Sequence, residues 1–239
     1  MTIRGKRVSP VRLALGLGVA AGLTALALST WPDAATSGTA AARAITSGPV
    51  EPGTAKPADA TEAGVVEAVK ESFTHALIVD RQLGNPLSQG ELRLRPTPGA
   101  TDPQAASRQA VPSAADRGLR ITRDRKNINA HFGSPALVAR ENHRLNLTMA
   151  AYADPDVRVI GDGVSTLAFT SVTVNGNTAT IEARAHEWTK SVARQQAGGR
   201  WLDASPEADT IWHAKLAKGP TGTWMVAEFI VGFTNGSGP

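Results

Sequence analysis

Glu141 is the side chain in this sequence whose surroundings most favour acid–base chemistry. At about 100° per residue along a helix, it falls within an apolar stripe formed by Leu137, Val138, Leu145 and Met149. Burial raises the pKa of a carboxylate unless a cation pairs with it, so Glu141 is a candidate general acid or base. The alternative is a structural carboxylate that reaches water or pairs with an arginine. We favour this alternative, because unpaired buried carboxylates are rare.

A second group of candidate residues lies on the alternating segment 177–190. One face of this segment is small and apolar, and the other carries larger polar and aromatic side chains: Glu182, Arg184, His186 and Trp188. If that face lines a cavity, its Glu, Arg and His are catalytic candidates, and Trp188 is a binding candidate. If the apolar face is the core instead, the polar face is solvated. The alternation favours the second arrangement.

Residues 117–126 form the strongest concentration of positive charge in the chain. Only Asp124 opposes five basic side chains, which are Arg117, Arg120, Arg123, Arg125 and Lys126. This cluster could bind acidic wall polymers or lipid head groups, or it could be a solvated arm. No aromatic side chain lies between its members, so we expect no nucleic-acid binding through base stacking.

The chain has no motif that is typical of a metal or cofactor site. His186 and Glu187 begin like a zinc-protease motif, but the second histidine is missing and the segment is strand-like. The aspartates at 154, 156 and 162 lack the spacing of a calcium-binding EF-hand loop. The absence of cysteine excludes disulfides and thiolate sites. We therefore expect no metal and no cofactor.

The elements that would position these residues follow from the periodicity of the chain. Helical spacing predicts helices over 61–80 and 134–152. Period-two segments flank the hairpin signal Asn175-Gly176, and a further pair, 209–218 and 223–233, flanks residues 219–222. The pattern predicts an α+β fold, with N-terminal helices packed on a curved antiparallel meander of four or more strands. Residues 84–130 are predicted to form an irregular basic insertion that could contain a short helix and, at 91–95, a short edge strand.

The net charge of this 239-residue chain is located at its N-terminus. The chain carries 25 Lys and Arg against 21 Asp and Glu, a net charge of +4, and four basic residues lie before residue 13. Removing those four leaves 21 against 21. An uncharged apolar run of sixteen residues, 13–28, follows them, which is the layout of an export signal. Because a spanning helix needs about 20 residues, we favour a cleaved signal peptide over a signal anchor.

Three regions follow from this organisation. Residues 1–32 form the signal peptide or anchor, 33–60 a disordered linker poor in large apolar side chains, and 61–239 a single α+β domain. Either reading of the N-terminus places the domain outside the cytoplasm, secreted or anchored to the outer face of the plasma membrane. The membrane is contacted only through the N-terminal segment.

The order of the expected elements is similar to that of a known superfamily. Residues 173–181 (TVNGNTATI) and 223–226 (TWMV) resemble strands of nuclear-transport-factor-two-like cone-fold proteins of the exported actinobacterial type. Ketosteroid isomerase-like and polyketide-cyclase-like proteins belong to that superfamily. The resemblance covers about residues 61–233 and implies a curved sheet with helices on one face. No catalytic motif of the superfamily matches, so the resemblance assigns no site residue.

Three hypotheses about function follow. The first is a non-catalytic domain that binds an envelope protein or a small apolar ligand. The second is a small-molecule isomerase, dehydratase or hydrolase that uses Glu141 with His186 or Arg184. The third is an accessory subunit of an envelope complex. The enzyme hypothesis requires Glu141 and the polar face of 177–190 to meet at one cavity.

Overall fold

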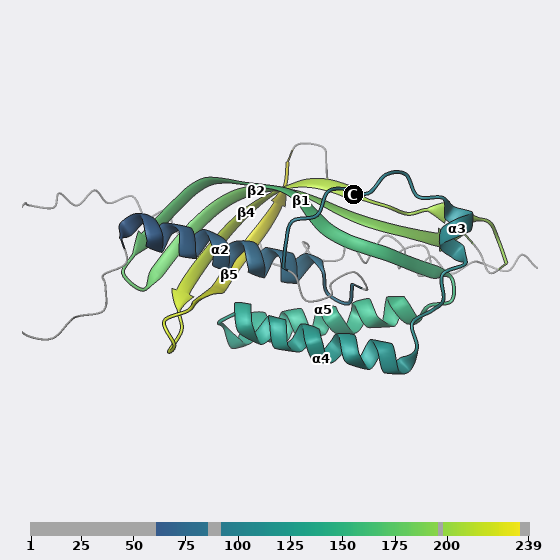
Figure 1. Ribbon diagram of the computed structural model, residues 1–239, viewed down its shortest axis with the longest axis horizontal. Helices are drawn as coiled ribbons and strands as arrows, with labels where there is room; N and C mark the ends of the chain where they lie inside the picture. Colours follow the sequence, from purple (N-terminus) through teal and green to yellow (C-terminus); the bar gives the residue numbers. More distant parts are fainter. Residues whose placement is uncertain (1–60, 86–91, 196–197, 235–239) are drawn as a thin grey trace, which may run out of the picture.

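The structure is a computed structural model that describes residues 61–85, 92–195 and 198–234. The export segment and the linker predicted from the sequence lie outside these described residues. Along the described chain, four helices precede five strands, which confirms the predicted α+β class (Figure 1). Within the same residues, no helix is long and apolar enough to cross a membrane.

The two helices predicted from periodicity are present and begin at hydroxyl caps. Helix α2 spans Glu62–Arg81, and the Thr61 hydroxyl accepts a hydrogen bond from a backbone amide in its first turn. Helix α5 spans Pro135–Ala153, and the Ser134 hydroxyl does the same. Such caps satisfy amides that have no partner within the helix, and they fix where each helix begins.

The region expected to be irregular, 84–130, contains a long helix. Helix α4 spans Ala114–His131 and begins with a capping box, in which Ser113 and Asp116 each bond the other's backbone amide. A short helix, α3 (Pro103–Ser107), precedes it. The expectation of irregularity was therefore wrong for residues 114–130. The basic residues of 117–126 lie on a helix and do not form a loose arm.

The sheet is antiparallel throughout and has the order β1-β2-β4-β5, with the short strand β3 paired to β2. The strands are β1 (Val157–Asn175), β2 (Thr178–Arg194), β3 (Trp201–Asp203), β4 (Glu207–Lys218) and β5 (Trp224–Phe233). The hairpin predicted at Asn175-Gly176 joins β1 to β2. Three register shifts interrupt the β1–β2 pairing, and one interrupts β4–β5. Bulges of this kind bend strands locally and increase their twist.

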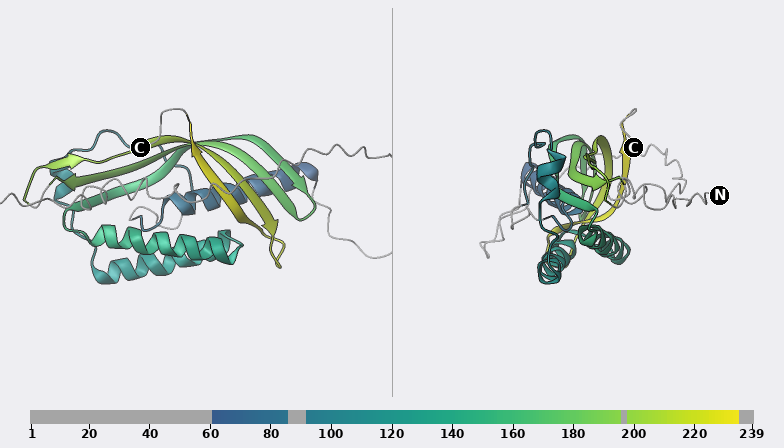
Figure 2. Two further views of the ribbon diagram at one scale, coloured as in Figure 1. Left: turned by 180° about the vertical axis from the view of Figure 1, so that it is seen from behind. Right: turned by 90° about the vertical axis from the view of Figure 1, so that its right-hand side faces the viewer.

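The three long helices lie on one face of the sheet. Helix α2 runs along that face, and α4 and α5 form a pair beside it (Figures 1 and 2). The predicted apolar face of β2 is buried there together with Trp212 and Leu216 of β4. Phe73 of α2 packs edge-on against Trp212, with ring centroids 6.2 Å apart. The main core is therefore a layer between one sheet face and three helices.

The segment that precedes α4 covers part of the other sheet face. Ala106 of α3 joins Val192 and Trp201 in a second apolar cluster. The predicted edge strand at 91–95 is not formed over residues 92–95, and Arg95 N donates one hydrogen bond to Val164 O at 2.8 Å. Trp188 is 1% exposed because this segment lies over it, and its indole donates to Arg95 O at 3.0 Å.

Candidate functional site

A buried ionic cluster joins α2 to α5 beneath the sheet. Glu141 is 0% exposed, and its Oε2 lies 2.6 Å from Arg144 Nη1. Arg144 also pairs with Asp80, from the last turn of α2. Arg140 completes the group through its Nη2, 2.8 Å from Glu141 Oε1. Glu141 is thus a buried carboxylate paired with arginines, which is the structural alternative that the sequence favoured.

The electrostatics of this cluster favour proton uptake at Glu141. Burial raises the pKa of Glu141 to about 7, and the neighbouring Asp80 carboxylate acts in the same direction. The charges of Arg144 and Arg140, with the hydrogen bond from Arg140, oppose the rise in pKa. Asp80 and Glu141 share the Arg144 guanidinium, so the charge of Asp80 makes the ionised form of Glu141 less favourable.

A second buried carboxylate, Glu187, ties the end of α2 to the sheet. Arg81 Nε lies 3.1 Å from Glu187 Oε2. On the other side, Glu187 Oε1 accepts hydrogen bonds of 2.7 Å from Thr210 Oγ1 and from Trp212 Nε1. Residues 80 and 81 therefore anchor α2 twice, once to α5 and once to the sheet.

Asp162 of β1 is the third buried carboxylate on this side of the sheet. It accepts a 2.6 Å hydrogen bond from Thr189 Oγ1, and its backbone carbonyl accepts one from Asn85 Nδ2 at 2.8 Å. Burial raises the pKa of Asp162 to about 6, against the opposing effects of the Thr189 hydrogen bond and the charges of Arg81 and Arg144. Like Glu141, Asp162 can hold a proton near neutral pH, while its contacts are made within the protein.

The polar face of β2 lies on the opposite side of the sheet from Glu141. Glu182 there accepts a 3.1 Å hydrogen bond from Thr170 Oγ1, and Arg184 is exposed. His186 Nδ1 lies 2.7 Å from Asp209 Oδ1, and this hydrogen bond is the main cause that raises the pKa of His186. The sheet separates these residues from Glu141, so the shared site required by the enzyme hypothesis is not assembled.

The basic residues of α4 do not form one surface. Arg120 Nη1 donates to Gly84 O at 3.1 Å, and Arg123 Nη2 donates to Asn85 O at 3.2 Å. Both contacts turn inward, toward the end of α2. Arg117 bonds the Pro112 carbonyl, whereas Arg125 and Lys126 are exposed. The expected basic patch is thus divided between inward-facing contacts and solvent.

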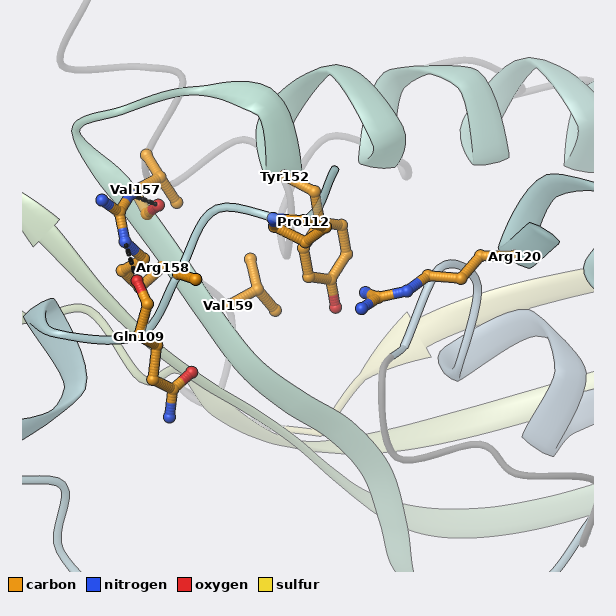
Figure 3. Close-up of a pocket in the computed structure, with 8 residues that line it drawn as sticks. Gln109, Pro112, Arg120, Tyr152, Val157, Arg158 and Val159 are labelled. Carbon is orange, nitrogen blue, oxygen red and sulfur yellow. Dashed lines mark hydrogen bonds between the residues drawn. The ribbon is translucent and has the colours of Figure 1, made fainter. Parts of the chain in front are cut away.

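A small cavity lies where α5 leads into β1. It has a volume of about 80 Å³, and its lining includes Arg120, Tyr152, Val157 and Val159 (Figure 3). Tyr152 is 4% exposed, and its hydroxyl has no hydrogen-bond partner among the residues that the structure describes. Among the described residues, no group of three or more His, Asp or Glu side chains is arranged to hold a metal ion.

Six of these residues were not chosen as site candidates from the sequence, although Asp162 and Glu187 were considered there as parts of metal-binding motifs and rejected. They are Asp80, Arg81, Arg144, Tyr152, Asp162 and Glu187. Arg144 lies three residues after Glu141, a spacing that brings two side chains together on a helix. The pairing of Glu141 with Arg144 could therefore have been predicted from the sequence. Asp80 lies 64 positions from Arg144, and nothing local connects the two.

The fold defined by these elements, helices on one face of a curved antiparallel sheet, has similar solved structures. One is the intermembrane space region of the chloroplast protein ARC6, at 15% identity and a TM-score of 0.38, covering 57% of this chain and 100% of that chain. Another is a periplasmic fragment of TraM, at 7% identity and a TM-score of 0.36, covering 70% and 97%. A nuclear transport factor 2 (NTF2-like) superfamily protein from Salmonella enterica serovar Typhimurium has 14% identity and a TM-score of 0.30, covering 49% and 84%.

The superfamily that the sequence resembles is thus among the similar structures. No family model matches the chain, and no curated protein matches it. At these identities and TM-scores, the similarities carry no argument about activity or partners. The function is therefore argued below from the chain's own residues.

Proposed function

We propose that this chain is an extracytoplasmic, non-catalytic domain that binds an extended segment of an envelope protein along the outer edge of β5. The observation that carries the proposal is the open state of this edge. β5 ends the sheet and pairs with β4 on one side only. On its other side, the described residues contact it at Val226, through a bridge to Phe132 and a hydrogen bond from Gly133 N.

Apart from one bulge, the residues of this edge lack the usual features that prevent strand pairing. Natural edge strands are blunted by lysine, proline or bulges. β5 has a register shift near Ala227, but residues 228–233 contain one charged residue, Glu228, which pairs with Lys215 of β4 at 3.0 Å. Ile230 is 47% exposed and Phe233 is 36% exposed. A partner strand would gain main-chain hydrogen bonds along the edge and apolar contacts with both side chains.

The short length of the open edge favours an extended partner segment over a second copy of this chain. About six residues are open, and stable dimers of folded domains bury about 1,200 Å² or more. An extended segment can pair along β5 and contact the side chains beside this edge on both faces of the sheet. The phenylalanine at 229 lies beside the edge, with the Arg140 guanidinium 4.1 Å above its ring centroid, and offers such a contact.

Support for the extracytoplasmic location comes from the sequence. Four basic residues followed by sixteen uncharged apolar ones are typical of an export signal. Support for a non-catalytic role comes from the buried carboxylates, whose contacts are with side chains of the same protein. The role as an accessory subunit of an envelope complex is a special case of the same proposal.

Site-specific photocrosslinking in the native host tests the proposal. A photoreactive residue replaces Ile230 in the full chain, and the matched control replaces Thr180, which is exposed on the central strand β2. We expect an adduct with a different protein in the envelope fraction from position 230 and none from position 180. Equal adducts at both positions, none at either, or an adduct with the mass of two copies of this chain would each overturn the proposal.

A further inference from the structure

The cavity beside Tyr152 combines a polar end with apolar walls. It lies at the end of α5 away from the β5 edge, between the first residues of β1 and the segment that joins α3 to α4. Val157, Val159 and Pro112 supply apolar surface, and Gln109 and Ala110 at the border are exposed. Figure 3 shows the Tyr152 hydroxyl directed toward the guanidinium of Arg120.

The Tyr152 hydroxyl is the first indication of a ligand. Buried tyrosine hydroxyls usually have a hydrogen-bond partner, and within the described part of the chain this one has none. The ring is fixed by close packing against Gly84, whose φ is +76° and where a Cβ would lie 3.2 Å from Tyr152 Cε2 and 2.1 Å from Met149 Cε. The hydroxyl therefore cannot easily turn to find a partner within the protein.

The Arg120 guanidinium is the second indication. Its carbon lies 5.3 Å from the centre of the Tyr152 ring, and one of its nitrogens donates to the Gly84 carbonyl. Among the described residues, Arg120 makes no salt bridge. The nearby carboxylates already have partners, since Asp124 bonds Arg123 and Gly84 N, and Asp162 bonds Thr189. Asp116, one helical turn before Arg120, is close enough for the two charges to attract, but no ion pair joins them among the described residues. Arg120 thus has further N–H groups for a ligand at this end of the cavity.

The protonation state of Tyr152 agrees with a donor role. Burial raises the pKa of the phenol well above its ordinary value, with the charge of Asp162 acting in the same direction. The phenol consequently keeps its proton at neutral pH. A phenol and a guanidinium together present donors, and the ligand atoms that match them are hydrogen-bond acceptors that carry negative charge.

We propose that this cavity binds the carboxylate of a small aliphatic carboxylic acid. Tyr152 Oη and the Arg120 guanidinium donate hydrogen bonds to its oxygens, and the two valines contact the first carbons of its chain. The cavity volume of about 80 Å³ is several times the about 10–15 Å³ that a single water molecule needs, so the head group and adjoining carbons fit inside. The aliphatic chain of a longer acid would extend out of the cavity past the exposed residues Gln109 and Ala110.

Methyl and amide NMR of the full chain tests this site with butyrate as the probe. We expect saturable shifts at the methyl groups of Val157 and Val159, and about tenfold weaker binding of butyramide, which has the same shape without the charge. Tyr152→Phe should weaken butyrate binding about tenfold, and Arg120→Gln at least as much. The matched control is Arg125→Gln, which removes an exposed arginine from the same helix and should leave butyrate binding unchanged.

Each other outcome counts against the proposal. Absence of saturable shifts with butyrate, or equal binding of butyramide, overturns the carboxylate ligand. Unchanged binding in Tyr152→Phe overturns the site, because that variant removes only an unpartnered hydroxyl and should keep the fold. If Arg125→Gln weakens binding as much as Arg120→Gln, the effect is general electrostatics and the site is again overturned.

Discussion

Carboxylates with basic partners occur on both faces of the sheet, buried on the helical face and exposed on the outer face. On the helical face, Glu141 is 0% exposed and Arg144 bridges it to Asp80. On the outer face, the Glu182 side chain is 43% exposed and lies 3.8 Å from His213. The same residue types therefore fasten helices to one another on the inner face, and are solvated on the outer one.

The difference between the two faces shows which ion pairs stabilise the fold. A buried pair depends on each partner, because removal of one leaves the other charged in a medium of low dielectric. An exposed pair contributes little, because water replaces the lost partner. The binding sites that we propose lie elsewhere, at the outer edge of β5 and at the Tyr152 cavity.

The largest expected effect is at Arg144. Arg144→Met removes the cation that Asp80 and Glu141 share, and it should lower the free energy of unfolding by about 3–5 kcal/mol. Urea denaturation near neutral pH, followed by far-UV circular dichroism, measures this change. A loss below about 1 kcal/mol would show that the inner cluster behaves like an exposed pair.

The pH dependence of stability should also reveal the inner cluster. The folded-state pKa values of Glu141 and Asp162, about 7 and about 6, lie above their ordinary values. A raised carboxyl pKa gives stability that is complete below the ordinary pKa and is lost as the pH rises through the folded value. The domain should therefore be more stable at about pH 5 than at about pH 7.5.

Glu141→Gln serves as the control for this pH dependence. The substitution keeps the shape of the side chain but removes its titration, so it should flatten the change in stability between the two pH values. Denaturation midpoints of both proteins across this range provide the measurement. If the variant keeps the full pH dependence, Glu141 does not take up the proton.

Substitution of Tyr152 should change the free energy of unfolding less than Arg144→Met does, and in the opposite direction. Its buried hydroxyl has no hydrogen-bond partner, so Tyr152→Phe should leave the free energy of unfolding unchanged or raise it by about 1 kcal/mol. The same denaturation measurement applies, in buffer without carboxylic acids. A loss of more than about 1 kcal/mol would indicate that the hydroxyl is bonded within the folded protein.

The smallest expected effect is on the outer face. Glu182→Ala removes a half-exposed carboxylate from Thr170 and His213, and it should change the free energy of unfolding by less than about 0.5 kcal/mol. A loss comparable to that of Arg144→Met would contradict the difference between the two faces.

Local patterns in the sequence predicted which face each residue occupies. Helical spacing placed Glu141 in the apolar stripe of α5, and alternation placed Glu182 and His186 outside, as the structure finds. The same alternation put Trp188 on the outer face, yet Trp188 is buried there by residues 92–95. The periodicity of a strand indicates which sheet face a side chain occupies. It does not indicate whether that face is buried, because the segment that covers the face comes from elsewhere in the chain.

The missed elements lacked a local signal strong enough to be recognised. Helix α4 presents few apolar residues, with Ile121 and Ile128 among many polar ones, so its capping box at Ser113 was the better indicator. The contact of Asp80 with Arg144 depends on how α2 crosses α5, which is set by packing over the whole core. The Tyr152 cavity arises in the same way, from three segments that meet only in the folded chain.

We propose above that an envelope protein binds along the open edge of β5, and one pair of substitutions tests this binding most directly. Ile230→Lys introduces the charge that natural edge strands use to prevent pairing, and Thr180→Lys places the same charge on a strand that already has two neighbours. The measurement is the amount of the envelope protein, identified by crosslinking, that copurifies with each full-length variant. We expect Ile230→Lys to lose the partner and Thr180→Lys to retain it. Retention by Ile230→Lys, or equal loss in both variants, would contradict the account.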